Sequence, residues 1–183
     1  MDVSFSVDNR AIAAVVVLQL GDLEILEKRT LPVELFFPYI PGFLGVREAD
    51  AVISVLNTLE HDFDVLMVNG HGVMHPRGFG LACQVGVLCD VPTIGVAKRL
   101  IDGRYIKRAT QRHHAIGEFQ LITENNNELG AFFKGKYASV EHKMSLKNAL
   151  DIVEMTSVFK TPEPIRQAYI LETETFKQEL RGN

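Results

Sequence analysis

Two acids and one amide that lie far apart in the sequence are of the types that together hold a divalent cation. Asp2 opens the chain, Glu48 lies in a segment with helical spacing, and Asn69 follows the apolar run 65–68. We expect the three side chains to meet at one edge of a sheet and to bind Mg²⁺ through oxygen atoms. A carboxylate at position 69 would complete such a site, whereas the amide supplies the oxygen without the charge. Taken singly, Asp2 and Glu48 could each be an ordinary solvated acid. The prediction of a metal site therefore depends on the three side chains lying close together in the fold.

The turn after this amide is rich in residues that let the backbone approach a ligand closely. Gly70 and Gly72 tolerate conformations and contacts that a side chain would forbid. His71 and His75 stand four residues apart, a spacing that zinc sites use, but the glycines and Pro76 argue against one regular helix face. No third ligand stands nearby in the sequence. We therefore predict a ligand-binding turn and reject zinc, while His75 suits a core position as well as a phosphate contact.

The elements that would carry these residues follow an informative order. Three antiparallel strands precede alternating helix and strand, which is the order of an α/β, ribonuclease H-like fold with a mixed sheet and helices on both faces. In such a sheet the first strand lies beside the fourth, which places Asp2 next to Asn69, and Glu48 reaches the same edge from the helix between them. The expected strands are 1–6, 11–20, 23–31, 65–68 and 93–97, with a hairpin of 115–122 and 129–133, and the expected helices are 43–59, 79–88, 145–159 and 165–180.

Length and composition limit the class of protein. The 183 residues suggest one domain over 1–183. Cys83 and Cys89 are too few for a disulfide framework, which favours a reduced, cytoplasmic setting. The longest apolar run, 11–20, has only half the length of a membrane span, so no membrane association is expected.

Clustered cations offset the acidic total. The net charge of −4 argues weakly against a nucleic-acid partner, but two local groups of cations can bind a phosphate backbone. A solvated surface loop is the plainer interpretation of each group taken alone. The first group is Lys98, Arg99, Arg104, Lys107, Arg108 and Arg112, and the second is Lys134, Lys136, Lys143 and Lys147.

Four ordered motifs carry a resemblance to a known family. They are residues 38–44, 47–48, 69–77 and 91–98, and the match extends from Asp2 to Arg166. The chain resembles endonuclease V in these motifs. The resemblance implies a ribonuclease H-like fold and Mg²⁺ as cofactor, with Mn²⁺ as a substitute. It also implies hydrolysis of the second phosphodiester bond on the 3′ side of hypoxanthine, chiefly in DNA repair, with some members acting on inosine in RNA.

The resemblance assigns the catalytic roles residue by residue. Asp2 matches the first metal-binding aspartate and Glu48 the catalytic glutamate, whereas Asn69 occupies the position of the second metal-binding aspartate. Lys98 matches a lysine near the scissile phosphate. His142 matches a histidine that supports the metal site, although the usual Gly-His-Arg begins with Glu141 in this chain.

The resemblance also assigns the residues that would bind substrate. Tyr39 matches the wedge tyrosine, whose ring fills the gap left when the damaged base leaves the stack. A pocket that reads a flipped base through main-chain groups needs small residues. The matched pocket positions are Gly42, Leu44, Gly70, Gly72, Gly80 and Leu81, to which the turn adds His75 and Arg77.

Asn69 leaves three explanations open. It is an engineered substitution, a natural change that gives a weak or inactive reader of inosine, or a site of partial deamidation to aspartate, which the sequence Asn69-Gly70 favours. The chain is accordingly a metal-dependent endonuclease or an inosine-binding module. A different ribonuclease H-like nuclease, such as a junction resolvase, would need a richer acidic cluster. We expect a monomer that binds deaminated DNA or inosine-containing RNA, and the sequence does not distinguish the two.

Overall fold

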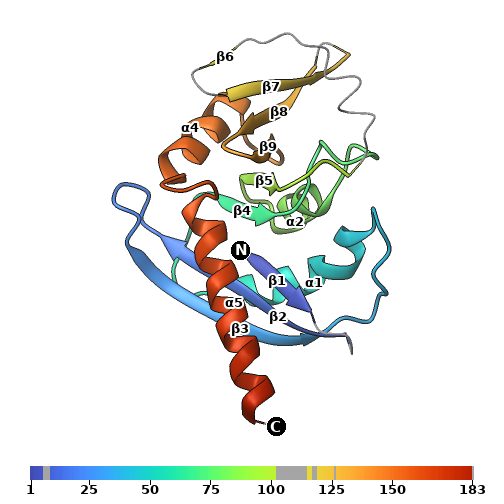
Figure 1. Cartoon of the computed structure of the whole chain (residues 1–183), viewed down its shortest axis with the longest axis vertical. Helices are drawn as coiled ribbons and strands as arrows, with labels where there is room; N and C mark the ends of the chain where they lie inside the picture. Colours follow the sequence, from blue (N-terminus) through green and yellow to red (C-terminus); the bar gives the residue numbers. More distant parts are fainter. Residues whose placement is uncertain (6–8, 102–114, 117–118, 126, 183) are drawn as a thin grey trace.

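Strands in two sheets, with helices on both faces, form the molecule in the computed structural model (Figure 1). The structure describes residues 1–182 apart from 6–8, 102–114, 117–118 and 126. The first sheet is the antiparallel series β1 (Asp2–Phe5), β2 (Arg10–Leu18) and β3 (Ile25–Glu34). The second has the order β4 (Leu66–Asn69), β5 (Thr93–Ala97), β9 (Lys136–Val140), β8 (Asn127–Phe133), β7 (Phe119–Glu124) and β6 (Ala115–Ile116). The helices are α1 (Leu44–Leu56), α2 (Leu81–Cys89), α4 (Leu146–Thr156) and α5 (Glu163–Gly182).

Backbone hydrogen bonds at Met1 join the two sheets. The Met1 amine donates to the Met67 carbonyl at 2.9 Å, and the Asn69 N–H donates to the Met1 carbonyl at 3.2 Å. This is the pairing of parallel neighbours, with Met1 opposite Val68. The first strand therefore lies beside the fourth, as predicted, and Asp2 lies next to Asn69.

Apolar side chains on alternating sides of the strands form two cores. In β4, Leu66 and Val68 pack with α1 and α2, whereas Met67 packs with α4 and the start of α5. This alternation follows from the pleat of a strand, which sends successive side chains to opposite faces. The prediction of helices on both faces of a mixed sheet is confirmed.

Several segments differ from the predicted elements. The predicted strand 115–122 is two strands, β6 and β7, which pair with each other, and the predicted helices 43–59 and 145–159 end three residues earlier, at Leu56 and Thr156. β3 runs three residues further than expected, through Pro32 to Glu34. It is the outer strand of its sheet, where the missing N–H of proline is tolerated. β9 was not predicted. Lys134 and Gly135 have φ of +45° and +86°, the left-handed backbone that a two-residue hairpin turn requires.

Ser145 begins α4 as predicted, since its side chain accepts from the Asn148 N–H. None of the described helices is both long and apolar enough to cross a bilayer. Four of the six cations in the first predicted basic group, Arg104, Lys107, Arg108 and Arg112, lie outside the described residues.

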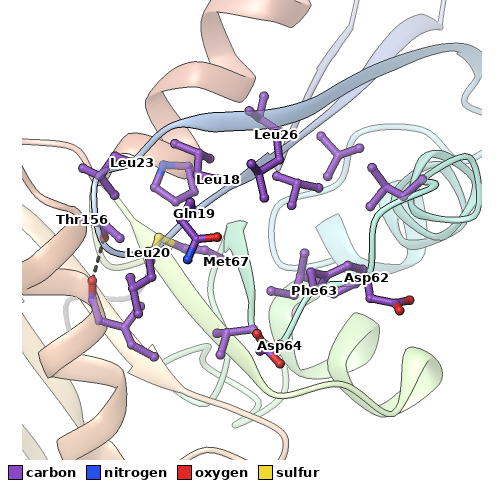
Figure 2. Close-up of a pocket in the computed structure, with 18 of the residues that line it drawn as sticks. Leu18, Gln19, Leu20, Leu23, Leu26, Asp62, Phe63, Asp64, Met67 and Thr156 are labelled. Carbon is purple, nitrogen blue, oxygen red and sulfur yellow. Dashed lines mark hydrogen bonds between the residues drawn. The ribbon is translucent and has the colours of Figure 1, made fainter.

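An apolar groove lies between β2 and β4, past the start of β1 (Figure 2). Leu18, Leu20 and Leu23 line it from the end of β2 and the turn that follows, and Phe63 and Met67 line the opposite side. The Met1 amine bonds to the carbonyl of Met67, which is one of the residues that line this groove.

Candidate functional site

Asp2, Glu48 and Asn69 meet at the edge where β1 begins and β4 ends. Asp2 and Glu48 are only 7% and 4% exposed. The Asn69 Nδ2–H donates to Asp2 Oδ1 at 2.9 Å, and the Val3 N–H donates to the same oxygen at 3.0 Å. Burial raises the pKa of Asp2, and the Asn69 hydrogen bond partly opposes this. Burial, together with the charge of Asp2, raises the pKa of Glu48 to about 8.

These three side chains fit a divalent cation, but they carry one negative charge fewer than three acids would. Two buried carboxylates that raise each other's cost of ionisation are stabilised by a cation between them. Asn69 now turns its amide nitrogen toward Asp2, and rotation of the amide would present its oxygen instead. Among the described residues, no three His, Cys, Asp or Glu side chains gather as a metal-binding group. Within the described part of the chain, Asp2, Glu48 and the Asn69 oxygen are the candidate ligands that the structure brings together at this edge.

Two lysines continue the same edge beyond the acids. Lys98 follows β5 directly and is exposed. Lys136 begins β9, where Tyr137 pairs with Ala97. Burial and the charge of Lys98 lower the pKa of Lys136, whereas Asp2 raises it. Lys136 thus belongs beside Lys98 and Asp2. The sequence predicts it only as a member of the second group of cations, because its place beside the acids depends on β9, which was not predicted.

His142 does not join this group. β9 runs antiparallel to β5, so the chain after Val140 returns to the beginning of β5, where the Thr93 N–H donates to the His142 carbonyl. There His142 Nε2 lies 2.8 Å from Asp90 Oδ1. The expectation that His142 supports the metal site therefore disagrees with the structure, which places it at the opposite end of β5 from Lys98.

The loop that carries Tyr39 is anchored to the turn that follows β4. Tyr39 is 59% exposed. Gly42 has a φ of +83°, which favours glycine, and its carbonyl accepts from Arg77 Nη1 at 3.0 Å. The Arg77 guanidinium lies 3.8 Å from the centre of the Phe43 ring. Arg77 therefore fixes the base of the loop and leaves the tyrosine ring accessible.

A hollow of about 240 Å³ lies between this loop and the first turns of α1 and α2. Neither helix has a side-chain cap at its N-terminus. At α2 the Ala82 N–H donates to the His71 carbonyl instead, whereas the first N–H groups of α1 remain available. Six of the predicted substrate residues line the hollow, namely Gly42, Leu44, His75, Arg77, Gly80 and Leu81. The other lining residues were not predicted, and they are Phe43, Gly45, Val46, His71, Phe79, Gln84 and Ile101.

Two of the predicted glycines are required by close packing. A Cβ on Gly80 would lie 2.3 Å from the His71 carbonyl oxygen, and one on Gly72 would lie 1.4 Å from Glu141 Oε1. Gly70 is less constrained, since its Cβ would lie 3.3 Å from Leu81. Gly70 and Gly72 lie behind the hollow and shape it without lining it.

His71 presents a neutral imidazole in this lining. It is 9% exposed, and burial, with a smaller effect of His75, lowers its pKa to about 4. Its Nδ1 atom is buried and has no hydrogen-bond partner among the described residues. A buried ring nitrogen without a partner is costly, and one in a pocket wall can bond to a ligand.

Glu141 holds the turn from behind. Its carboxylate accepts from the Val73 N–H at 2.9 Å, from Ser139 Oγ at 2.6 Å and from Cys83 Sγ at 2.7 Å. Burial raises the pKa of Glu141 to about 7. The acid at the start of the unusual Glu141-His142-Lys143 sequence therefore ties together β9, α2 and the turn.

Glu141→Gln is expected to flatten the pH dependence of stability. Glu141 has a folded pKa of about 7, above the usual 4.5, so the folded protein binds the extra proton and the free energy of unfolding falls as pH rises through this window. Glutamine removes that titration. Urea unfolding at pH 5, 6, 7 and 8 tests this, with Glu128→Gln on the exposed surface as the control. Equal slopes for the parent and Glu141→Gln would contradict it.

Comparison with known proteins matches almost the whole chain to one family. Residues 1–170 match the family model for endonuclease V. Endonuclease V of Dictyoglomus thermophilum is 34% identical over 184 residues, covering 97% of this chain and 79% of that protein. The human protein of that name is 34% identical over 201 residues, covering 98% and 71%.

Solved structures give the same result. The crystal structure of the catalytic domain of human endonuclease V has a TM-score of 0.84 at 33% identity, covering 98% of this chain and 81% of that one. Ciona intestinalis endonuclease V in complex with a 24mer DNA containing an inosine followed by a ribo-adenosine has a TM-score of 0.84 at 28% identity, covering 97% and 84%.

Proposed function

This chain belongs to the endonuclease V family, and we propose that it is a metal-dependent endonuclease specific for inosine. It would hydrolyse the second phosphodiester bond on the 3′ side of the lesion with Mg²⁺ or Mn²⁺, more slowly than a chain with aspartate at position 69. The observation that carries the proposal is the juxtaposition of two buried acids with a hollow for a base. The bound inosine of the Ciona protein supports the choice of substrate.

The hollow suits a displaced hypoxanthine. Its walls contribute backbone N–H groups from the start of α1, which has no side-chain cap and which can donate to the carbonyl oxygen that hypoxanthine has at C6. Adenine has an amino group at that position, and two donors would then face each other. The neutral His71 offers a further hydrogen bond to the base.

The acids would hold the cation at the phosphate to be cut. Asp2 and Glu48 supply two carboxylates and Asn69 an amide oxygen, the oxygen ligands that magnesium prefers. When bound, the metal lowers the pKa of a water and offsets charge on the phosphate. Lys98 and Lys136 lie along the same edge, where their ammonium groups can bind phosphate oxygens.

A non-cleaving reader of inosine is the second candidate. Asn69 supports it because the amide already satisfies Asp2 through a hydrogen bond and adds no charge for a cation. Such a protein would bind the lesion through the hollow and Tyr39 and release it uncut.

Cleavage of end-labelled strands separates the two functions. Strands with one inosine or one adenosine at the same position, in DNA and in RNA, are incubated with Mg²⁺ or Mn²⁺. A product cut at the second bond past inosine alone supports the nuclease. Inosine-selective binding without product supports the reader, and the absence of any preference for inosine would overturn both.

Tyr39→Ala is expected to weaken binding of an inosine-containing duplex about tenfold. The exposed ring would stack in the gap left by the displaced base, and base–aromatic stacking contributes roughly 1–3 kcal/mol. Fluorescence anisotropy in EDTA measures the dissociation constant without cleavage. Phe36→Ala serves as the control, because Phe36 is 88% exposed on the same loop. Equal losses for the two variants would contradict a specific wedge.

A further inference from the structure

Cations and an exposed aromatic ring extend the edge of the site beyond its acids. From β1 the edge passes β4 and β5 to β9 and the β8–β9 turn, placing Asp2, Lys98, Lys136 and Lys134 in order. Neighbouring strands are about 4.8 Å apart, so the four steps from β1 to β8 span roughly 19 Å. At about 3.4 Å per nucleotide of a helical strand, this distance corresponds to roughly five or six nucleotides.

The far end of this edge carries what we term the cation–aromatic cluster. It surrounds a shallow hollow and consists of Lys134, Val158, Phe159, Lys160, Thr161 and Arg166. Phe159 is 59% exposed and the Arg166 guanidinium lies 5.1 Å from its ring centre. Lys134 Nζ donates to the Ser157 carbonyl at 3.1 Å, which fixes the turn against this segment.

The composition of the cluster matches one kind of partner. An exposed aromatic face among cations binds single-stranded nucleic acid, because bases stack on the ring and phosphates pair with the cations. Glu163, which follows this segment, is 6% exposed and accepts from Arg166 through both carboxylate oxygens. The surface therefore presents an excess of positive charge beside the ring.

The polarity of the reaction identifies which part of the strand lies here. The base hollow is formed by α1 and α2 on one face of the sheet, whereas the cluster lies at α4 and α5 on the other. The acids lie between them at the edge. We propose that the cation–aromatic cluster binds the cleaved strand on the 3′ side of the cut bond, an inference that rests on the proposed cleavage 3′ to inosine. The strand would run from the hollow across the acids to Phe159.

The length of the 3′ arm provides the test. The double variant Phe159→Ala/Lys160→Ala is compared with the parent chain on single strands that carry one inosine and about 12 or about 3 nucleotides beyond it, with identical 5′ arms. Binding is measured in EDTA by fluorescence anisotropy. We expect the variant to bind the long-armed strand about tenfold more weakly and the short-armed strand as well as the parent does. Lys28→Ala, a change on the exposed side of β3, should have no effect on either strand.

Several outcomes would overturn this assignment. An equal loss on both strands, no loss on either, or a larger loss on the short-armed strand would each place the 3′ segment elsewhere. Strands with adenosine in place of inosine keep the two proposals apart. If the parent does not prefer inosine, the proposed function fails, whereas a loss by the variant on the long-armed strand alone tests the cluster.

Discussion

Asn69→Asp is expected to raise the rate of inosine-dependent cleavage about a hundredfold at limiting Mg²⁺. The present amide donates to Asp2 and contributes no charge to the two buried acids. Two unit charges about 4 Å apart interact by roughly 4 kcal/mol at an effective dielectric constant of 20, and a divalent ion doubles this. Repulsion among three acids removes a large part of that gain. A net of about 3 kcal/mol corresponds to roughly two powers of ten.

The same variant should lose stability when no metal is present. A third carboxylate raises the cost of ionising Asp2 and Glu48, so the melting temperature in EDTA should fall and Mg²⁺ should restore it. Asn125→Asp, on the exposed surface, is the control for the charge change. Equal cleavage rates and equal Mg²⁺ dependence in the parent and Asn69→Asp would mean that the amide oxygen suffices as a ligand.

Glu48→Gln is expected to lower cleavage at least about a thousandfold while it stabilises the metal-free protein. The side chain is isosteric, but it removes one of the two charges available to a cation. The folded pKa of Glu48 is about 8 against the usual 4.5, so the folded protein binds more protons than the unfolded chain between these values. The metal-free parent should therefore lose stability as pH rises from about 4.5 to 8. The variant should lose less.

Two measurements on the same preparations test this prediction. Cleavage in Mg²⁺ should disappear. The Glu48→Gln change is best introduced into Asn69→Asp, whose higher cleavage rate makes the loss large enough to quantify. Thermal unfolding in EDTA at pH 5 and pH 8 should show a smaller difference for Glu48→Gln than for the parent. Asp50→Asn, on the exposed side of the same helix, should change neither result. Retained cleavage would remove Glu48 from the catalytic group.

The meeting of Asp2, Glu48 and Asn69 could be predicted because it depends on strongly patterned elements. The apolar runs of β2 and β4 and the helical spacing of α1 identify each element and its order in the chain. That order places β1 beside β4, and the backbone bonds at Met1 realise it. A long apolar run can occupy only a few positions in a fold, so its position can be predicted from few assumptions.

The positions of Lys136 and His142 could not be predicted in the same way. Both depend on β9, whose five residues include a lysine, a serine and only a weak apolar alternation. Without β9, its antiparallel pairing with β5 cannot be predicted either. This pairing places Lys136, at the start of β9, near the acids and places His142, after the end of β9, far from them. Glu141 is a third case, because the space for its carboxylate is created by Gly72 and Gly95 from other elements. A single sequence does not show that glycines from other elements leave room for a side chain in the folded protein.

The buried amine of Met1 has a practical consequence for anyone who wishes to immobilise or label the protein. A residue joined to this amine would enter a buried position, bonded through its amide to the Met67 carbonyl and close to Asp2. The end of α5 projects away from both sheets (Figure 1). An affinity handle or fluorophore belongs at that end, where it leaves the acidic edge as it is in the unmodified protein.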